Sequence, residues 1–248
     1  MKPEDVLVID CSVTEAYPDA GAGVLLMDGI GVTCPPELLT AVRLETESGL
    51  RTTYAGRDRA ALATLPPFPS YVAFYKRFKK TYHVLLQLES VALKQRSIAS
   101  PGGLVTAMFM AELETGLLSA GHDRRTLALP LRLMSAAGGE EFETMSGEIK
   151  RLKAGDLHMA DPSGTVSSVV YGPDRRTQLQ PDTISALYTT YAVPGVTDAQ
   201  VARHLNILES YVQRLHPEAV TKLKATFRPH HGKEEAPPEA APYPRGAL

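Results

Sequence analysis

Two stretches of the sequence repeat the same set of reactive side chains. The first repeat, GHDRRTLALP, spans Gly121–Pro130, and the second repeat, GPDRRTQLQP, spans Gly172–Pro181. Each contains an acid, two arginines and a threonine, which together can hold an anion or a polar substrate, since arginine binds carboxylate and phosphate oxygens bidentately. The repeats are either two parts of one pocket or the same turn chemistry used twice, because Asp and Thr side chains also stabilise turns.

Within the repeats, His122 and Asp174 are the candidate catalytic residues. An imidazole has an ordinary pKa near neutral pH and can orient a water molecule. A carboxylate can accept a hydrogen bond from a substrate hydroxyl, and a pocket built in this way rejects the analogue without the hydroxyl by on the order of 10⁴-fold. We expect the two side chains to face one cavity with an arginine at its rim. The candidate substrate-binding residues are Arg175, Arg176, Thr177 and Asp123.

Composition and charge narrow the class of protein. The 248 residues are 44 % hydrophobic and 22 % charged, which is typical of a globular protein. The net charge of −2 provides no overall basic field, so that any nucleic-acid contact requires a local patch. Cys11 and Cys34 are too few for a disulfide framework or a cysteine zinc site. No apolar run reaches membrane-spanning length, and we therefore expect a cytoplasmic protein without a membrane contact. We also expect no metal and no cofactor.

The segment YVAFYKRFKKTY, which begins at Tyr71, contains the candidate RNA-binding residues. Its apolar and basic side chains alternate with helical spacing, which predicts a helix with one cationic face. Cations beside aromatic rings can follow an RNA backbone, although a solvated helix face is the plainer alternative. The candidate RNA-binding residues, here called the basic segment, are Lys76, Arg77, Lys79 and Lys80.

The expected secondary structure mixes strands with helices. Strands are predicted over 6–13, 22–32, LALPLRLM and TISALYTTYAV, and a hairpin is predicted around the Asp-Pro-Ser-Gly turn. Helices are predicted over 35–50, over VLLQLESVALKQR, from Ser100 to Gly121, and after a capping box at Thr197 and Gln200. The pattern favours an α/β fold of the mixed α+β kind, a single compact domain with mixed β-sheets and central helices.

The composition changes near the C-terminal end. From about Thr226 the chain is FRPHHGKEEAPPEAAPYPRGAL, in which Pro, Ala and charged residues replace periodic apolar ones. Such a segment has little apolar surface to bury. We therefore expect one domain over 1–225 and a disordered tail over 226–248.

The order of these motifs resembles a known family. YVAFYKRF, SIASPGGLVTAMFMAELETGLLSAGHD, GGEEF, LKAGDLHMADPSG and VVYGPDRRTQLQPDTISALY follow one another as in the tRNA-binding editing module of the phenylalanyl-tRNA synthetase beta chain. That module consists of the paired third and fourth B-modules and also occurs as a free-standing protein. The resemblance covers roughly residues 66–215. It implies a compact α/β module that binds aminoacyl-tRNA.

The resemblance also assigns roles to residues. In the synthetase the module hydrolyses mischarged tyrosyl-tRNA. His122 matches the histidine that follows the family's long helix, and Asp174 stands where the family has a glutamate after a Gly-Gly pair. Here that stretch is Gly172-Pro173, and the acid is shorter. The synthetase's catalytic domain is absent from the sequence, so that no aminoacylation is expected.

Two functions follow as hypotheses. The first is a free-standing deacylase that hydrolyses a mischarged aminoacyl ester in trans, for which it would need a positioned water and groups that stabilise an oxyanion. The second is a non-catalytic module that binds an amino acid, a small metabolite or RNA. The expected partner is tRNA or aminoacyl-tRNA, with a small amino-acid-like ligand as the other candidate.

Overall fold

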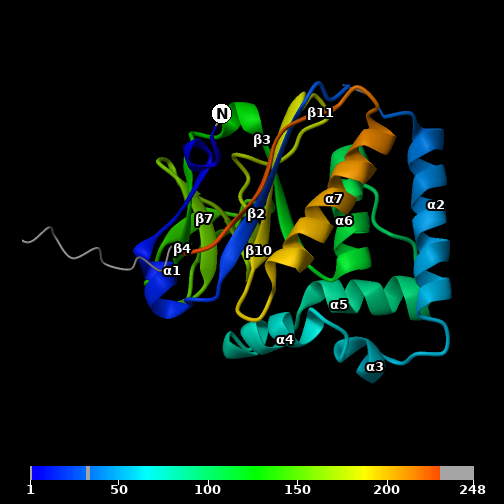
Figure 1. Cartoon of the computed structure of the whole chain (residues 1–248), viewed down its shortest axis with the longest axis horizontal. Coiled ribbons are helices and arrows are strands. Elements are labelled where there is room, and N and C mark those ends of the chain that lie inside the picture. Colours follow the sequence, from blue (N-terminus) through cyan, green and yellow to red (C-terminus); the bar gives the residue numbers. More distant parts are fainter. Residues whose placement is uncertain (1, 32–33, 230–248) are drawn as a thin grey trace, which may run out of the picture.

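Sheets and helices are stacked in layers (Figure 1). The computed structural model describes residues 2–31 and 34–229. A four-stranded sheet lies between a five-stranded sheet and two helices, α6 (Gly103–Thr115) and α7 (Asp198–Leu215). Helix α2 (Pro36–Thr53) packs outside these two helices, and α4 (Phe68–Arg77) and α5 (His83–Leu88) lie across one end of the layers. The structure confirms the predicted mixed α/β fold in a single domain.

The five-stranded sheet has its first two strands parallel and the others antiparallel. The predicted hairpin around the Asp-Pro-Ser-Gly turn is confirmed as β7 and β8. The strand predicted over 6–13 is correct only in its first half, because Asp10 accepts a hydrogen bond from the Ser12 amide (3.0 Å) and begins helix α1, Cys11–Ala16. In spatial order the strands are β1 (Leu7–Ile9), β4 (Leu131–Ser135), β7 (Leu157–Asp161), β8 (Gly164–Ser168) and β9 (Gly172–Pro173).

The four-stranded sheet is antiparallel and forms the centre of the molecule. The strand predicted over TISALYTTYAV is confirmed as β10, and the strand predicted over 22–32 is found as β2 but ends at Asp28, residue 32 lying outside the described residues. Almost every residue of the two strands is buried. They read as continuous apolar runs because a sheet on one face and helices on the other exclude water from both sides. In spatial order the strands are β11 (Val220–Phe227), β2 (Gly21–Asp28), β10 (Ser185–Ala192) and β3 (Leu118–Asp123).

Helix α6 ends earlier than the sequence predicts. The predicted end was Gly121, whereas the helix ends at Thr115 and Gly116 caps it in the left-handed conformation (φ +74°). Glycine adopts this conformation without steric cost, and its amide donates to the Glu112 carbonyl at 2.7 Å. The next residues form β3, so that His122 lies on a strand of the central sheet instead of following a helix.

The basic segment also differs from its prediction. Helix α4 ends at Arg77, and Lys79 adopts a positive φ of +58° in a turn closed by the Lys80 amide, which donates to the Tyr75 carbonyl (3.1 Å). The four cations therefore occupy the end of a helix and the turn after it, and the prediction of one cationic helix face is wrong. The turn at Lys79 and Lys80 is a Schellman motif, in which a residue in the left-handed conformation allows the following amides to satisfy the last carbonyls of the helix.

The other elements complete the architecture. The capping box predicted at Thr197 and Gln200 is confirmed, and α7 ends before Pro217. Helix α5 continues into a π-helical turn, Glu89–Leu93. Among the residues that the structure describes, no helix is both long and apolar enough to cross a membrane. The remaining short elements are α3 (Arg59–Ala63) and the hairpin of β5 (Glu141–Glu143) and β6 (Ile149–Arg151).

The folded part of the chain extends past the predicted domain boundary at residue 225. Phe227 pairs with Ala22 in the central sheet. The Arg228 guanidinium donates to Asp198 Oδ1 (2.6 Å) and to the Val196 carbonyl (2.7 Å). Thr226 to Arg228 therefore belong to the domain, because their backbone and side-chain groups are paired with it. Residues 230–248, which hold the rest of the predicted tail, lie outside the described residues.

Candidate functional site

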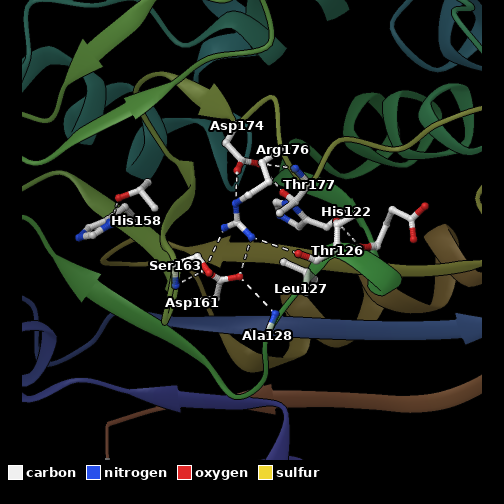
Figure 2. Close-up of polar contacts among 12 residues, drawn as sticks. His122, Thr126, Leu127, Ala128, His158, Asp161, Ser163, Asp174, Arg176 and Thr177 are labelled. Atoms are coloured by element: carbon white, nitrogen blue, oxygen red, sulfur yellow. Dashed lines mark hydrogen bonds and ion pairs between the residues drawn. The ribbon is translucent and has the colours of Figure 1, made fainter.

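The two repeats lie side by side and form one polar network (Figure 2). The Asp123 amide, at the end of β3, donates to the Thr177 carbonyl at 2.8 Å, and His122 forms an antiparallel bridge with Gln178. Arg176 of the second repeat donates to the carbonyl of Thr126 in the first (3.1 Å). The sequence repeat is thus two neighbouring segments of one structure, whose first residues lie in β3 and β9.

A chain of hydrogen bonds joins the two candidate catalytic residues. The Thr177 hydroxyl donates a hydrogen bond to Asp174 Oδ1 and lies 2.7 Å from His122 Nδ1. Since its own proton is used in the first bond, its oxygen accepts a hydrogen bond from the N–H at Nδ1. The Thr177 amide also donates to Asp174 Oδ1 (3.0 Å). Ser167 Oγ lies 3.5 Å from His122 Nε2, the other ring nitrogen. All three network side chains are buried, with 0 % of His122 and Thr177 and 4 % of Asp174 exposed.

Burial determines the protonation of His122 and Asp174. Together with the positive charge of Arg176, and against the opposing effect of Asp161, it lowers the pKa of His122 to about 3. Burial also raises the pKa of Asp174, although the hydrogen bonds from Thr177 and the charge of Arg176 oppose this. The expectation that the His122 pKa lies near working pH is wrong, because the ring has no contact with water. At neutral pH His122 is an uncharged imidazole.

Arg176 connects the network to the five-stranded sheet. Its guanidinium binds Asp161, at the end of β7, through Nη2–Oδ1 (2.9 Å) and Nη1–Oδ2 (3.0 Å) contacts. Its Nε lies 3.6 Å from Asp174 Oδ2, so that the guanidinium stands between two carboxylates (Figure 2). Asp161 also accepts bonds from the amides of Ala128 and Ser163. Arg175, which precedes Arg176 in the sequence, is exposed and pairs with Glu143 (3.0 Å).

The acid of the first repeat, Asp123, also has its hydrogen-bond and ion-pair partners within the protein. Asp123 is 1 % exposed, binds the guanidinium of Arg125 (2.7 Å between Nη2 and Oδ2) and accepts a bond from its amide (2.9 Å). The Thr183 hydroxyl, which comes shortly after the second repeat, donates to Asp123 Oδ2 (3.0 Å). The predicted substrate-binding residues Asp123, Arg176 and Thr177 therefore already have partners within the protein.

The network stands beside a cavity but does not line it. Neither His122 nor Asp174 lines any of four surface cavities formed by residues 2–31 and 34–229. The two side chains are joined through Thr177, none of these four cavities lies between them, and a cavity shared by them stays a prediction. The neighbouring cavity, at the start of α6, is lined by Thr183 and by Leu179 and Gln180 of the second repeat. The catalytic and substrate-binding roles of the repeat residues stay predictions.

The basic segment lies elsewhere, at the end of α4. All four of its side chains are exposed. Arg77 packs its guanidinium over the ring of Tyr17, and Lys80 places its ammonium over the ring of Tyr171, each 4.9 Å from the ring centre. In the part of the chain that the structure describes, no carboxylate lies within 4.0 Å of the four charged groups. The segment therefore presents unpaired positive charge beside two tyrosines.

Replacing Arg176 with methionine should lower the free energy of unfolding by about 2–3 kcal/mol, because a buried carboxylate loses its counter-ion. Burial alone would raise the pKa of Asp161, but the hydrogen bonds from Arg176, Ala128 and Ser163 outweigh it and lower that pKa. The matched control is Arg175→Met, whose exposed ion pair should contribute less than about 1 kcal/mol. Urea unfolding of both variants measures the difference, and equal losses would show that the fold does not depend on Arg176 as the counter-ion of Asp161.

Sequence reasoning missed the residues that form the cavity. Its polar end is built by Gly103 and His216, which are far apart in the sequence. The Gly102-Gly103 pair was the available signal, because two glycines at the start of a helix indicate a close approach of other atoms. Nothing in the sequence indicated which side chain approaches. Among the described residues no group of three or more His, Cys, Asp or Glu side chains is placed to hold a metal ion.

Comparisons with known proteins find a distant similarity among solved structures only. No family model matches the sequence, and no curated protein matches it. Among solved structures, the chain is similar to the crystal structure of an N-terminal fragment of the phenylalanyl-tRNA synthetase beta-subunit from Pyrococcus horikoshii, with a TM-score of 0.43 and 10 % sequence identity. The alignment covers 85 % of this chain and 48 % of that one, so that the chain spans about half the length of the fragment. A likeness of this degree does not bear on function.

Proposed function

We propose that this protein binds tRNA through the basic segment at the end of α4. The observation that carries the proposal is a local group of exposed, unpaired cations on a chain whose overall net charge is −2. Binding to a nucleic-acid backbone depends on such cations, because each neutralised phosphate releases condensed counter-ions. The sequence resemblance to a tRNA-binding module points to the same class of partner.

The surroundings of the basic segment fit a polyanion. Lys153 is also exposed and precedes Gly155, at which a built Cβ would lie 4.0 Å from the Arg77 guanidinium. The loop after β6 thus approaches the end of α4, and we count Lys153 as a fifth cation available to the same partner. Arg77 and Lys80 are held against tyrosine rings, which restricts their rotamers and lowers the entropy that binding must remove.

The geometry of the repeats favours binding over hydrolysis. An ester-cleaving residue must reach its substrate or a water within about 3 Å, whereas His122 is fully buried and both of its nitrogens face protein hydroxyls. Asp174 is likewise engaged by Thr177. We therefore favour the non-catalytic alternative, in which the protein holds tRNA or aminoacyl-tRNA and leaves the ester intact.

Binding of labelled tRNA to the wild-type protein, measured at several salt concentrations, tests the proposal. With four to five phosphate contacts, the logarithm of the association constant should fall with the logarithm of salt concentration with a slope of about −3 to −4. Absence of binding at 50 mM salt would remove tRNA as the partner. A panel of mischarged tRNAs incubated with the same protein tests hydrolysis, and faster loss of any ester would restore the deacylase hypothesis.

A further inference from the structure

A cavity of about 360 Å³ opens at the N-terminal end of α6. Its volume lies in the range of small-molecule sites, which are concave and mostly apolar with a few polar groups. Segments from five parts of the chain form it: the loop after β2, the start of α2, the start of α6, the end of the second repeat and the end of α7. No Asp, Glu, Lys or Arg side chain is among the described residues that line it. The apolar walls are formed by Ile30, Leu39, Leu104, Val105 and Leu179.

The first turn of α6 forms one side of the polar end. An α-helix leaves its first amide groups without an acceptor inside the helix. No side chain caps α6, and within the described residues the amides of Gly103, Leu104 and Val105 donate no hydrogen bond. These groups also carry the positive end of the helix dipole, which attracts a negative charge.

His216 forms the other side, as an independent polar group. Its side chain lines the cavity and is buried, with 6 % of the residue exposed. Neither Nδ1 nor Nε2 has a hydrogen-bond partner among the described residues, and the nearby Gly31 backbone does not reach hydrogen-bonding geometry. An unpaired buried polar group costs free energy, and polar groups left in this state indicate an unfilled partner position.

Gly103 brings the two sides together. A Cβ built on this residue would lie 2.8 Å from His216 Nε2 and 3.0 Å from Cys34 Cβ. Only a residue without a side chain leaves room for the imidazole against the first turn of the helix. The Nε2 of His216 therefore lies against the first residue of α6, and both residues line the cavity.

We propose that this cavity binds a small carboxylic acid with an apolar body, its carboxylate held by the first turn of α6 and by His216. Helix amides and one imidazole N–H offer donors to the two oxygens of a single negative charge. A phosphate ester would bring a higher charge, for which sites ordinarily provide arginine or lysine, and no such side chain lines this cavity. The apolar walls accommodate the rest of the molecule.

The repeats position one wall of this cavity. Thr183 lines it, donates to Asp123 Oδ2 (3.0 Å) and accepts a bond from the Gln180 amide (2.9 Å). The Leu179 side chain lies close over Gly121, where a built Cβ would meet its Cδ1 at 2.6 Å. The segment from Leu179 to Thr183 is therefore held against β3 by the polar network. In this arrangement the residues of the repeats act by positioning the site and do not contact the ligand.

The test is an NMR titration of the full chain with three probes: 3-phenylpropionate, its uncharged amide and phenyl phosphate. The carboxylate should shift the amide signals of Gly103 and Leu104 and should bind at least about 10-fold more tightly than the other two probes. His216→Phe keeps a ring of similar size without a donor and should weaken binding about 10-fold. Gly103→Ala should do the same, because its methyl group displaces the imidazole.

Gly49→Ala is the matched control, since a methyl group there meets no atom within 4 Å and Gly49 does not line this cavity. Thermal unfolding of each variant confirms that it is folded. The proposal is overturned if the amide binds as tightly as the acid, if both variants bind the acid as the wild type does, or if millimolar 3-phenylpropionate leaves the signals of Gly103 and Leu104 in place. tRNA binding does not depend on this cavity, so that the His216 variant separates this proposal from the previous one.

Discussion

Replacing Glu112 with glutamine should make the protein increasingly more stable than the wild type as the pH rises from 4.5 to 8. Glu112 lies on α6, with 2 % of the residue exposed. Burial raises the pKa of its carboxyl to about 8, although the Ser119 amide, which donates to Oε1 at 2.8 Å, opposes the shift. At neutral pH the folded protein therefore holds this side chain protonated and uncharged.

The sign follows from the two pKa values. The unfolded chain loses the proton near pH 4.5 and the folded chain near pH 8, so that the folded state binds more protons between these limits. The stabilisation is complete below pH 4.5 and is lost as the pH rises through 8. Glutamine keeps the acceptor for the Ser119 amide and does not ionise. The advantage of the variant should grow by about 1.4 kcal/mol per pH unit, to about 5 kcal/mol above pH 8.

Urea unfolding at half-unit steps of pH measures this advantage as the difference between variant and wild type. Other titrating groups, including the buried histidines, contribute equally to both proteins and cancel. Glu15→Gln on α1 is the control, because this side chain is exposed and the substitution should leave the pH dependence unchanged. A Glu112→Gln advantage that stays constant from pH 4.5 to 8 would mean that the carboxyl is ionised in the folded protein.

Removing the four charges of the basic segment should weaken tRNA binding on the order of 10³-fold at 0.1 M salt and reduce the salt slope by about 3. Each lost cation leaves one phosphate with its condensed counter-ions, and so each substitution lowers the logarithm of the association constant by a similar amount. Lys79 is best replaced by glycine, since its φ of +58° is one that glycine adopts without strain. The other three, Lys76, Arg77 and Lys80, are replaced by glutamine.

A second four-fold variant controls for the change in net charge. It removes four exposed cations near the junction of α2, α3 and the π-helical turn, namely Arg57, Arg59, Lys94 and Arg96. Both variants lose four positive charges, and only the first should show weaker tRNA binding. Equal weakening by the two would mean that tRNA responds to the total charge of the protein and has no defined contact at the end of α4.

Much of the secondary structure could be predicted because its signals are local. The turn between β7 and β8 and the cap of α7 depend on side chains within a few residues of one another, as does the start of α2 at Pro36. The errors occurred where two local signals compete. Asp10 can continue a strand or cap a helix, and Gly116 and Gly121 can each end a helix. Pairing of β3 with β10 decides the second case, and that pairing joins distant parts of the chain.

The site was predicted less well for the same reason. The sequence indicated that His122 and Asp174 come together, and they do, through Thr177. It could not indicate that Asp161 neutralises Arg176, because that contact requires the five-stranded sheet to be in place. Nor could it indicate burial, which changes His122 from a titrating group into an uncharged one. Residue type gave the chemistry, and packing determined whether that chemistry is accessible.

The edge strand β11 has a consequence for self-association. A free strand edge offers unpaired amides and carbonyls to another chain, and proteins often oppose aggregation there with bulges and lysines. β11 has an irregularity between Thr221 and Leu223, at the exposed Lys222. A strand added from a second molecule would find its ladder interrupted at this point and an ammonium group beside it. At its β11 edge the central sheet is therefore poorly suited to pairing with a strand of a second molecule.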